Sequence, residues 1–404
     1  MINNLPWETF DLPIQEIRRG YYSDVYFWRT KQILESQKKN PKILMQVFQR
    51  NDAVLCGIDE VRAVISTCAG YFANSGPAFY FFDELMEVKK EIRRAKIYDY
   101  QDSFLELCKK RIDLEEKLSG LWKNMSGEII VKSLKDGDQI YPWETVMTIE
   151  GPFSYFAHLE TVYLGILSRR TKVASNVKKV VEAANKKPVL FFPARFDHYS
   201  IQAGDGYAAF MSGVLGVSTN AQGEWWGKKG VGTIPHALIA AFNGDTVAAT
   251  LAFAKQYPKI DVIALVDFNN DCVETSLEVA GAMKKQGRTL WGVRLDTSGT
   301  MVDKSVISQM GRFNPVGVCQ QLVWNVRQAL DKEGFSEVRV GVSGGFNIKR
   351  IKEFEAVEVP VDFYGVGSSL FEGNYDFTAD IVKNEGKFCS KAGRQYNPNP
   401  NLKL

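Results

Sequence analysis

Residues Leu290–Gly299 read Leu-Trp-Gly-Val-Arg-Leu-Asp-Thr-Ser-Gly, and this stretch decides the predicted fold. It begins as an apolar run of strand length, reaches Arg294 and Asp296, and then turns at Ser298 and Gly299. Charged groups are therefore placed at the C-terminal end of a strand. That end is where α/β folds carry their chemistry.

The same order of apolar run, polar residue, glycine and helix recurs in six further places between Pro188 and Ser369. One such match is weak evidence, whereas seven in series are hard to obtain without parallel strands joined by helices. We expect strands at Val189–Arg195, Val217–Ala221, Val231–Ile234, Asp261–Asp267, Leu290–Asp296, Val338–Gly344 and Val361–Gly367. Seven strands are one fewer than the eight of a closed TIM barrel. The sequence therefore predicts an incomplete TIM-like α/β barrel, or one with an irregular member.

The length of the chain indicates two domains, because 404 residues exceed a comfortable single hydrophobic core. We expect an N-terminal α+β domain with inserted helices over residues 1–175 and the barrel over residues 176–375. Residues 376–404 are expected to form a C-terminal tail that packs back on the first domain.

Composition and charge narrow the class of protein. With 45% hydrophobic and 24% charged residues the chain is an ordinary globular protein, and its formal charge of +3 indicates neither nucleic acid nor a basic partner. Six scattered cysteines without a CxxC pair suit a reducing cytoplasm and disfavour structural zinc. The N-terminus lacks a signal-peptide pattern, and no apolar run reaches membrane-spanning length. We therefore predict a cytoplasmic protein.

The first domain combines strand and helix patterns. Strands are expected at Lys42–Gln49 and Ala53–Gly57, and two more around an Asp-Gly turn between residues 128 and 150. Asp83–Lys96 and Asp102–Leu118 are charge-rich with apolar residues three and four apart, which predicts amphipathic surface helices.

Two features of this domain each have two explanations. Three tyrosines within residues 20–27 can pack on a core or form an aromatic lid over a flat ligand. Arg169 and Arg170, in a helix expected over Tyr155–Ala174, can bind a phosphate or bridge the seam between domains.

Polar residues follow the predicted barrel strands, and in a barrel these strand ends converge on one mouth. They are Arg195, His198, Ser218, Thr219, Asn220, Thr233, His236, Asp267, Arg294, Asp296, Ser343, Gly344, Gly345, Gly365, Gly367, Ser368 and Ser369. The glycine-serine loops suit a phosphate, because bare backbone N–H groups can approach its oxygens. Two aspartates and two arginines suit a phosphorylated sugar, its hydroxyls or Mg²⁺. Each residue alone can be a helix cap or rim cover, so this pattern predicts only a phosphate-binding barrel enzyme.

Several short motifs follow one another in a specific order. They are Ser-Asp-Val-Tyr-Phe (23–27), Glu160-Thr161 with Leu164-Gly165, Phe192-Pro-Ala-Arg195, Ser218-Thr-Asn220, Gly232-Thr-Ile-Pro-His236, Val293-Arg-Leu-Asp296-Thr-Ser-Gly299, Ser343-Gly-Gly345 and Gly365-Val-Gly367. In this order they resemble the nicotinate phosphoribosyltransferases, within the type II phosphoribosyltransferases. The resemblance covers nearly the whole chain, and the Gly-Thr-x-x-His and Arg-x-Asp-x-x-Gly elements are its specific parts.

The resemblance implies a reaction in which nicotinate attacks C1′ of 5-phosphoribosyl 1-diphosphate, giving nicotinate mononucleotide and diphosphate in NAD biosynthesis. It also implies coupled ATP hydrolysis and Mg²⁺ that accompanies the substrate. Departure of diphosphate leaves an oxocarbenium-like centre, which needs nearby negative charge. We expect Asp267 and Asp296 to contact the ribose hydroxyls and the metal-linked substrate. The pyridine nitrogen is already a nucleophile, so no strong base is needed.

The remaining residues are assigned by the same resemblance. Arg195, with Arg294 second, is expected to bind the nicotinate carboxylate, and Asn220 can donate to it where nicotinamide-specific relatives carry an aspartate. The pyridine ring is expected to stack on Phe192, with Tyr26 of a second subunit on its other face, which implies a homodimer with shared active sites. The other predicted substrate-binding residues are Ser218, Thr219, Thr233, Ser343, Gly344, Gly345, Gly365, Gly367 and Ser368. Phe192 can alternatively be a core aromatic.

His236 is one of three histidines and begins an expected helix. A lone histidine is usually structural or a cap. The resemblance implies instead that ATP phosphorylates it and that phosphohistidine prepares the site, so we count it as catalytic with Asp267 and Asp296. Some family members carry a C-terminal zinc-binding cysteine cluster, whereas this tail keeps only Cys389, and Lys391 and Arg394 remain candidates for contact with the barrel mouth.

Three rival functions are weighed against this one. Nicotinamide phosphoribosyltransferase is the nearest rival and differs at residue 220. Quinolinate phosphoribosyltransferase must hold two carboxylates and eject one, for which the rim offers few basic residues. A non-catalytic phosphate-binding barrel could keep the glycine loops but would tolerate loss of Asp267, Asp296 or His236, which are all present.

Overall fold

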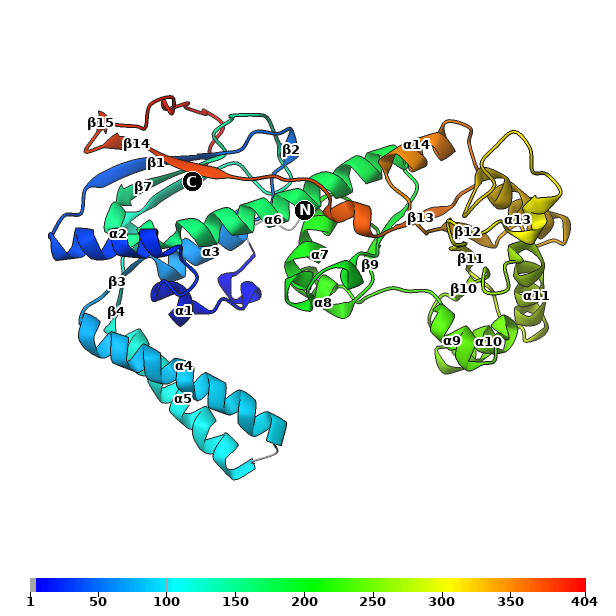
Figure 1. Cartoon of the computed structure of the whole chain (residues 1–404), viewed down its shortest axis with the longest axis horizontal. Coiled ribbons are helices and arrows are strands. Elements are labelled where there is room, and N and C mark those ends of the chain that lie inside the picture. Colours follow the sequence, from blue (N-terminus) through cyan, green and yellow to red (C-terminus); the bar gives the residue numbers. More distant parts are fainter. Residues whose placement is uncertain (1–4, 99–100) are drawn as a thin grey trace. The chain divides into compact units, whose positions relative to one another are not determined.

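The computed structural model of the chain describes residues 5–98 and 101–404, and these form two compact units (Figure 1). Unit 1 comprises residues 1–171 and 374–404, and unit 2 comprises residues 172–373. Helix α6, Glu160–Ala183, runs from unit 1 into unit 2. Residues 1–4, on which part of the N-terminal sequence argument rests, lie outside the described residues.

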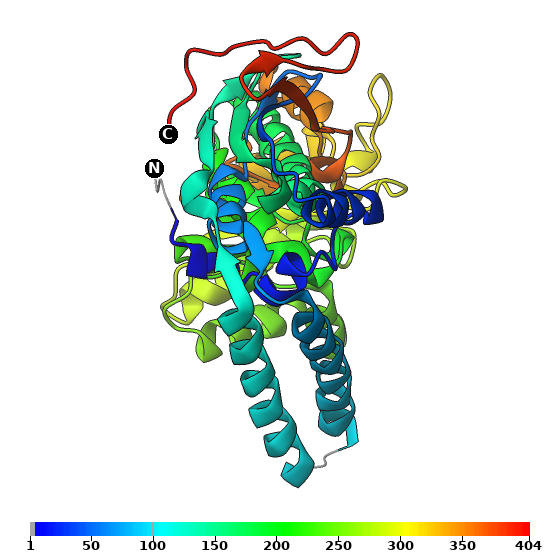
Figure 2. The same cartoon turned by 90° about the vertical axis from the view of Figure 1, so that its left-hand side faces the viewer.

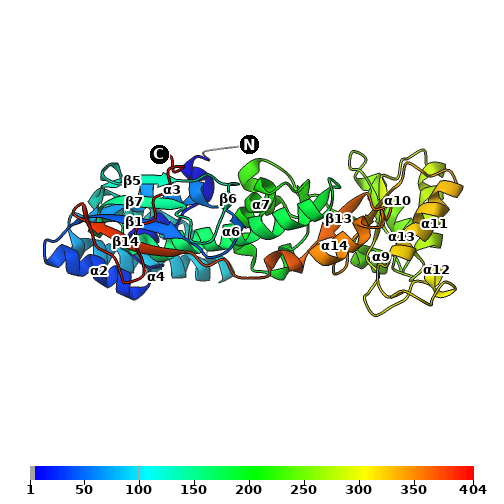
Figure 3. The same cartoon turned by 90° about the horizontal axis from the view of Figure 1, so that it is seen from above.

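Unit 1 is built on a five-stranded antiparallel sheet in the order β15–β14–β1–β7–β5, whose four longer strands lie side by side in Figure 3. Its strands are β1 Lys42–Phe48, β5 Ile130–Ser133, β7 Met147–Pro152, β14 Thr378–Asn384 and β15 Lys387–Phe388. Strand β14 pairs with β1 from Ile43 opposite Asn384 to Phe48 opposite Thr378. The C-terminal segment therefore supplies one of the central strands of this sheet.

Unit 1 also contains short helices and two two-stranded sheets. They are α1 Ile14–Arg18, α2 Val25–Ser36, α3 Ile58–Cys68, β2 Ala53–Val54 paired with β6 Gln139–Ile140, and β3 Gly70–Phe72 paired with β4 Trp122–Asn124. Val47 and Ile149 of the sheet, Val61 of α3 and Leu167 of α6 are fully buried in one apolar cluster. Burial of these side chains is the main favourable contribution to folding here.

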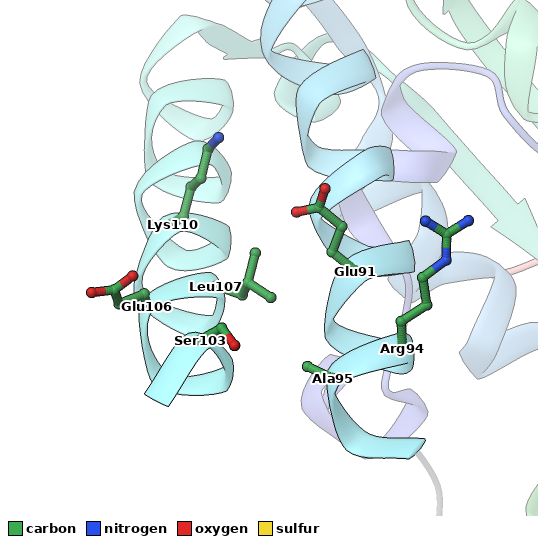
Figure 4. A pocket seen from close by; sticks show the side chains of 7 residues that line it. All are labelled: Glu91, Arg94, Ala95, Ser103, Glu106, Leu107 and Lys110. Atoms are coloured by element: carbon green, nitrogen blue, oxygen red, sulfur yellow. The ribbon is translucent and has the colours of Figure 1, made fainter. Parts of the chain in front are cut away.

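A long helical hairpin, α4 Ser75–Tyr98 and α5 Gln101–Leu121, follows β3 and returns to β4 (Figure 2). The structure confirms the two helices expected from the sequence and lengthens both. Near β3 and β4 the helices share a buried apolar seam that includes Phe82, Leu85 and Leu118. Towards the far end the seam becomes more polar: Leu107 and Glu91 point into the space between the helices, and Arg94 points away (Figure 4).

Unit 2 contains a curled parallel sheet of six strands in the order β10–β11–β12–β13–β8–β9. The strands are β8 Val189–Phe191, β9 Gly216–Val217, β10 Ile263–Leu265, β11 Gly292–Leu295, β12 Arg339–Val342 and β13 Phe363–Val366. The helices are α7 Gln202–Met211, α8 Asn220–Gly223, α9 His236–Ala241, α10 Thr246–Gln256, α11 Cys272–Lys285, α12 Lys304–Ile307, α13 Gln320–Lys332 and α14 Ile348–Glu355. Both units also contain short 3-10 helices. Those of unit 1 are Trp7–Phe10, Ser126–Glu128, Phe153–Tyr155 and Ala157–Leu159, and those of unit 2 are Ala194–Phe196, Tyr199–Ile201, Glu224–Trp226 and Ser368–Phe371.

The predicted count of seven parallel strands is wrong, because Val231–Ile234 forms no strand and the described part of the sheet has six. The segment still makes one backbone hydrogen bond with each edge of the sheet. The N–H of Val231 donates to the Val217 carbonyl at 2.7 Å, and the N–H of Ile234 donates to the Ile263 carbonyl at 3.1 Å. Glycines at 230 and 232 and the missing N–H of Pro235 disfavour a continuous ladder. An irregular connection thus lies between β9 and β10 where a further strand would close the barrel.

Over residues 5–98 and 101–404, no helix combines the length and the apolar character needed to cross a bilayer.

Lys31 of α2 is a buried cation inside unit 1, with 1% of its surface exposed. Its Nζ donates to the carbonyl oxygens of Gly70 at 2.6 Å and Ser154 at 2.7 Å, and lies 3.0 Å from Glu35 Oε1. Burial lowers the pKa of Lys31, and the neighbouring Glu35 opposes this shift. The ammonium group therefore links α2 to two other segments of the unit.

Replacing Lys31 with methionine is expected to lower the free energy of unfolding by about 2–4 kcal/mol, because two carbonyls lose their charged donor. Urea denaturation measures this change. Lys90→Met is the matched control: Lys90 pairs with Glu87 on the surface of α4, and its loss should change stability by less than about 0.5 kcal/mol. Equal shifts for the two variants would show that Lys31 does not hold these segments together.

Candidate active site

A cavity of about 540 Å³ opens at the C-terminal ends of the parallel strands of unit 2. The predicted site residues that line it are Phe192, Arg195, Ser218, Thr233, His236, Arg294, Asp296, Ser343, Gly344, Gly345, Gly365, Gly367 and Ser368. Residues from five neighbouring strand ends and from the irregular connection thus face one space. A cavity at this edge of a parallel sheet is the usual place for a ligand in such folds.

Arg294, Asp296 and Ser343 form a hydrogen-bonded triangle on the cavity wall. Nη1 of Arg294 donates to Ser343 Oγ at 2.9 Å and lies 3.2 Å from Asp296 Oδ2, and Ser343 Oγ donates to Asp296 Oδ1 at 2.8 Å. Burial lowers the pKa of the Arg294 guanidinium, whereas Asp296 opposes the shift. Arginine remains charged at neutral pH, so this wall presents a fixed cation and a fixed carboxylate.

His236 and Asp267 form a second polar pair. Nε2 of His236 lies 3.0 Å from Asp267 Oδ2 and 3.1 Å from Oδ1. The imidazole is 47% exposed, whereas the carboxylate is only 6% exposed, and this burial raises the pKa of Asp267. A buried carboxylate that holds Nε2 orients the ring and leaves Nδ1 as the nitrogen available to a reactant.

Two glycines at the cavity leave room for aromatic rings. A Cβ at Gly365 would lie 2.9 Å from the ring of Phe192, and a Cβ at Gly367 would lie 2.8 Å from the ring of Phe196. Phe192 is also fixed through its backbone, because its N–H donates to the Val366 carbonyl at 2.8 Å. Since Phe192 is half-buried and lines the cavity, the alternative of a core aromatic does not apply.

The segment Ser218–Asn220 is held by Gln222, which is 1% exposed. Oε1 of Gln222 accepts from the N–H of Ser218 at 3.1 Å, from the Ser218 hydroxyl at 3.1 Å and from the N–H of Thr219 at 3.2 Å. The Thr219 hydroxyl caps α8 in return, which completes a capping box. Sequence reasoning missed Gln222, although the Thr-x-x-Gln spacing of 219–222 is the signal that finds it. It also missed Phe196 and Phe346 of the cavity wall.

Four predicted site residues do not line the cavity. Asp267 reaches it through His236, Thr219 donates to Gln202 at 2.8 Å, and the Oδ1 atom of Asn220 accepts from the N–H of Gly230 at 3.0 Å. The fourth, Tyr26, belongs to unit 1.

Tyr26 is 61% exposed and lies on α2. Its hydroxyl donates to Asp24 Oδ2 at 3.3 Å, and Asp24 is in turn bound to Thr161, whose hydroxyl oxygen is 2.9 Å from both the N–H and Oδ2 of Asp24. Two of the sequence motifs therefore meet at the start of α2. Tyr21 and Tyr22 are also exposed, at 57% and 49%, so the core explanation of the tyrosine cluster is wrong.

Other candidate cations have partners within unit 1. Nε of Arg170 lies 2.9 Å from Glu60 Oε2, and both side chains are 11% exposed, which favours a structural role over phosphate binding. Arg394 lies 3.2 Å from Asp380 and over the ring of Trp143.

Comparisons with known proteins place this chain in a family. Nicotinate phosphoribosyltransferase pncB1 of Mycobacterium tuberculosis is 28% identical over 253 residues, which is 61% of this chain and 51% of that protein. A crystal structure of nicotinate-nucleotide pyrophosphorylase from Pyrococcus furiosus is 30% identical, covers 95% of this chain and 80% of that one, and superposes with a TM-score of 0.69. The chain belongs to the nicotinate phosphoribosyltransferase family.

Other matches show how much of the chain and of its relatives is similar. The nicotinate phosphoribosyltransferase of Bacillus subtilis is 22% identical over 284 residues, 70% of this chain and 54% of that protein. The chain thus spans about half the length of the curated relatives it matches. Human nicotinic acid phosphoribosyltransferase, at 15% identity, shares the fold with a TM-score of 0.65 over 93% of this chain and 77% of that one. A family model described as the N-terminal domain of quinolinate phosphoribosyl transferase matches residues 121–171.

In this family member, replacing Gln222 with methionine is expected to lower the free energy of unfolding by about 2–3 kcal/mol, because three donors lose one buried acceptor. Gln222→Glu keeps an acceptor oxygen at the same place and should lose less than half as much. Urea denaturation of both variants checks this order. If the glutamate variant were the less stable, the acceptor would not be what holds the segment.

Proposed function

We propose that this protein is a nicotinate phosphoribosyltransferase that forms nicotinate mononucleotide and diphosphate from nicotinate and 5-phosphoribosyl 1-diphosphate, with coupled ATP hydrolysis, in NAD biosynthesis. The observation that carries the proposal is a single cavity in which Arg195, Arg294 and Asp296 face the turn at Gly344 and Gly345. Cations, a carboxylate and bare backbone amides are the groups that a phosphorylated sugar and an aromatic acid require.

The 5′-phosphate is assigned to the turn after β12. Gly344 and Gly345 have φ angles of +84° and +70°, a conformation that other residues rarely adopt. Successive residues in such turns point their N–H groups to one side and form an anion-binding concavity. Ser368, at the neighbouring strand end, lines the same cavity and is the second contact that we assign to the phosphate.

The ribosyl centre is assigned to the two carboxylates of the rim. Loss of diphosphate leaves positive charge at C1′, which Asp296 and Asp267 stabilise from the protein side. These two groups lie close enough for Asp296 to raise the pKa of Asp267. One or two carboxylates together with substrate phosphates are an ordinary Mg²⁺ donor set, so these residues fit an ion that arrives with diphosphate. When bound, Mg²⁺ neutralises charge on the leaving group.

Nicotinate is assigned to the side of the cavity where Phe192 lies against Gly365. Arg294 is already held by Asp296 and Ser343, whereas Arg195 is exposed and lies over the ring of Phe196 at 5.2 Å, which favours Arg195 as the carboxylate ligand. The Oδ1 atom of Asn220 accepts from the N–H of Gly230, which fixes the amide group, and Nδ2 remains as the proposed donor. Tyr26 of a second subunit would cover the ring in a homodimer, for which its exposed position on α2 is suitable.

ATP is proposed to act through His236. Attack by Nδ1 on the γ-phosphorus forms an N–P bond, breaks the bond to the β-phosphate oxygen and releases ADP, and Asp267 stabilises the imidazolium through Nε2. Hydrolysis of the phosphohistidine by water then returns the free imidazole and inorganic phosphate. The half-exposed position of His236 leaves room for this transfer.

Diphosphate release from 5-phosphoribosyl 1-diphosphate tests the proposal directly. Purified protein with Mg²⁺ should release diphosphate with nicotinate, faster when ATP is present, and far less with nicotinamide. Quinolinate is the third substrate in the comparison, because a quinolinate domain model matches part of the chain. Release of diphosphate with quinolinate or nicotinamide, but not with nicotinate, would contradict the proposal.

His236→Ala should abolish the stimulation by ATP and leave slow, ATP-independent turnover. His198→Ala is the control, because His198 is exposed and bonded to Ser200 instead of lining the cavity. This variant should keep the stimulation. An unchanged ATP response in His236→Ala would refute the role of this histidine.

Gly365→Ala should raise the KM for nicotinate about tenfold, because the new Cβ displaces the ring of Phe192 at a cost of about 1–2 kcal/mol. The KM for 5-phosphoribosyl 1-diphosphate should change much less. Gly281→Ala on α11 is the control, since a Cβ there meets nothing within 4 Å. A larger effect on the KM for 5-phosphoribosyl 1-diphosphate would show that the pyridine ring does not bind beside Phe192.

A further inference from the structure

Arg350 of α14 connects the turn at Gly344 to a second segment of unit 2. Its Nη1 donates to the carbonyl of Gly344 at 2.8 Å, and its Nη2 donates to the carbonyl of Val318 at 2.8 Å. The guanidinium lies over the ring of Phe346, 4.3 Å from the ring centroid. Three contacts from different directions therefore fix its position, although Arg350 is not among the residues that line the substrate cavity.

The contact with Gly344 has a direct consequence for the turn. A peptide unit is planar and trans, so its C=O and N–H point in opposite directions. The carbonyl of Gly344 and the N–H of Gly345 belong to the same unit. When Arg350 holds the carbonyl on its own side, the N–H of Gly345 must point to the opposite side. Gly344 and Gly345 both line the cavity.

The two glycines of the turn make the contact with Arg350 necessary. Two consecutive glycines have little conformational preference, so the peptide between them can rotate unless something outside the turn holds it. Within the described residues, Arg350 is the side chain that donates to the Gly344 carbonyl. A cation on the carbonyl also polarises the peptide and makes its N–H a stronger donor to an anion.

We propose that Arg350 is a positioning residue for the phosphate of 5-phosphoribosyl 1-diphosphate, acting by holding the Gly344 carbonyl so that the Gly345 N–H points into the cavity. This inference rests on the proposed function, and it adds a residue from outside the cavity to the phosphate site. Arg350 does not touch the substrate. Its effect reaches the phosphate through one peptide unit.

The position of Arg350 permits a test by chemical rescue. Arg350 lines a separate cavity of about 740 Å³, so a guanidinium ion from solution can reach the space that Arg350→Ala leaves. Lys349 lines the same cavity and is the matched control. Its side chain is 87% exposed, and its Nζ lies 3.9 Å from Glu353 Oε1 in a surface ion pair.

Arg350→Ala should raise the KM for 5-phosphoribosyl 1-diphosphate at least about tenfold, the loss expected for one charged hydrogen bond, and change the KM for nicotinate less than about twofold. Arg350→Lys should be intermediate, because one ammonium cannot reach both carbonyls in the planar geometry of a guanidinium. Lys349→Ala should match the wild type. Low concentrations of guanidinium chloride should lower the raised KM of Arg350→Ala, and equal sodium chloride should not.

If Arg350 had a merely structural role, Arg350→Ala would raise both KM values together or lower kcat alone. Guanidinium would then not lower the KM for 5-phosphoribosyl 1-diphosphate. Each of these results overturns the proposal. Calorimetric titration with ribose 5-phosphate provides a readout that does not need turnover. If the wild type binds this phosphate but shows no transferase activity, the proposed function fails. If Arg350→Ala then binds it as tightly as the wild type does, the positioning role fails as well.

Discussion

The register of the parallel sheet in unit 2 is the constraint on which the candidate site depends. Leu295 pairs with Val342 and Val366 pairs with Phe191. The next residues along these strands are therefore brought together in pairs. Asp296 meets Ser343 in this way, and their oxygens are 2.8 Å apart. A slip of one residue would turn each of these side chains to the opposite face of the sheet.

Sequence reasoning reached the strand ends but not the contacts between them. The polar residues after each apolar run identified Arg294, Asp296 and Ser343 as neighbours in a general sense, because parallel strands end at one edge. The resemblance ranks Arg195 before Arg294 for a ligand's carboxylate, but the sequence could not show the physical reason, which is that Asp296 and Ser343 hold Arg294. Such choices depend on side-chain geometry, which periodicity does not contain.

Two parts of the fold show where local pattern is insufficient. Val231–Ile234 has the apolar character of a strand, but glycines and Pro235 around it leave one hydrogen bond with each sheet edge. Strand β14 shows the opposite limit. The sequence predicts a tail that packs on the first domain, but it gives no local signal for the pairing of Thr378 with Phe48, which are far apart in sequence. Local patterns identify elements, whereas long-range pairing depends on the packing of the whole unit.

The irregular connection also explains why the two members of the histidine pair differ in burial. Asp267 follows β10, which forms a regular parallel ladder with β11, and its carboxylate is almost inaccessible. His236 follows a connection with only isolated backbone hydrogen bonds, and its ring is half exposed. The exposed imidazole can be reached by a reactant, and the fixed, buried carboxylate returns the ring to one orientation afterwards. Closing the barrel with a regular strand would remove this difference, because His236 would then begin from a fully paired backbone.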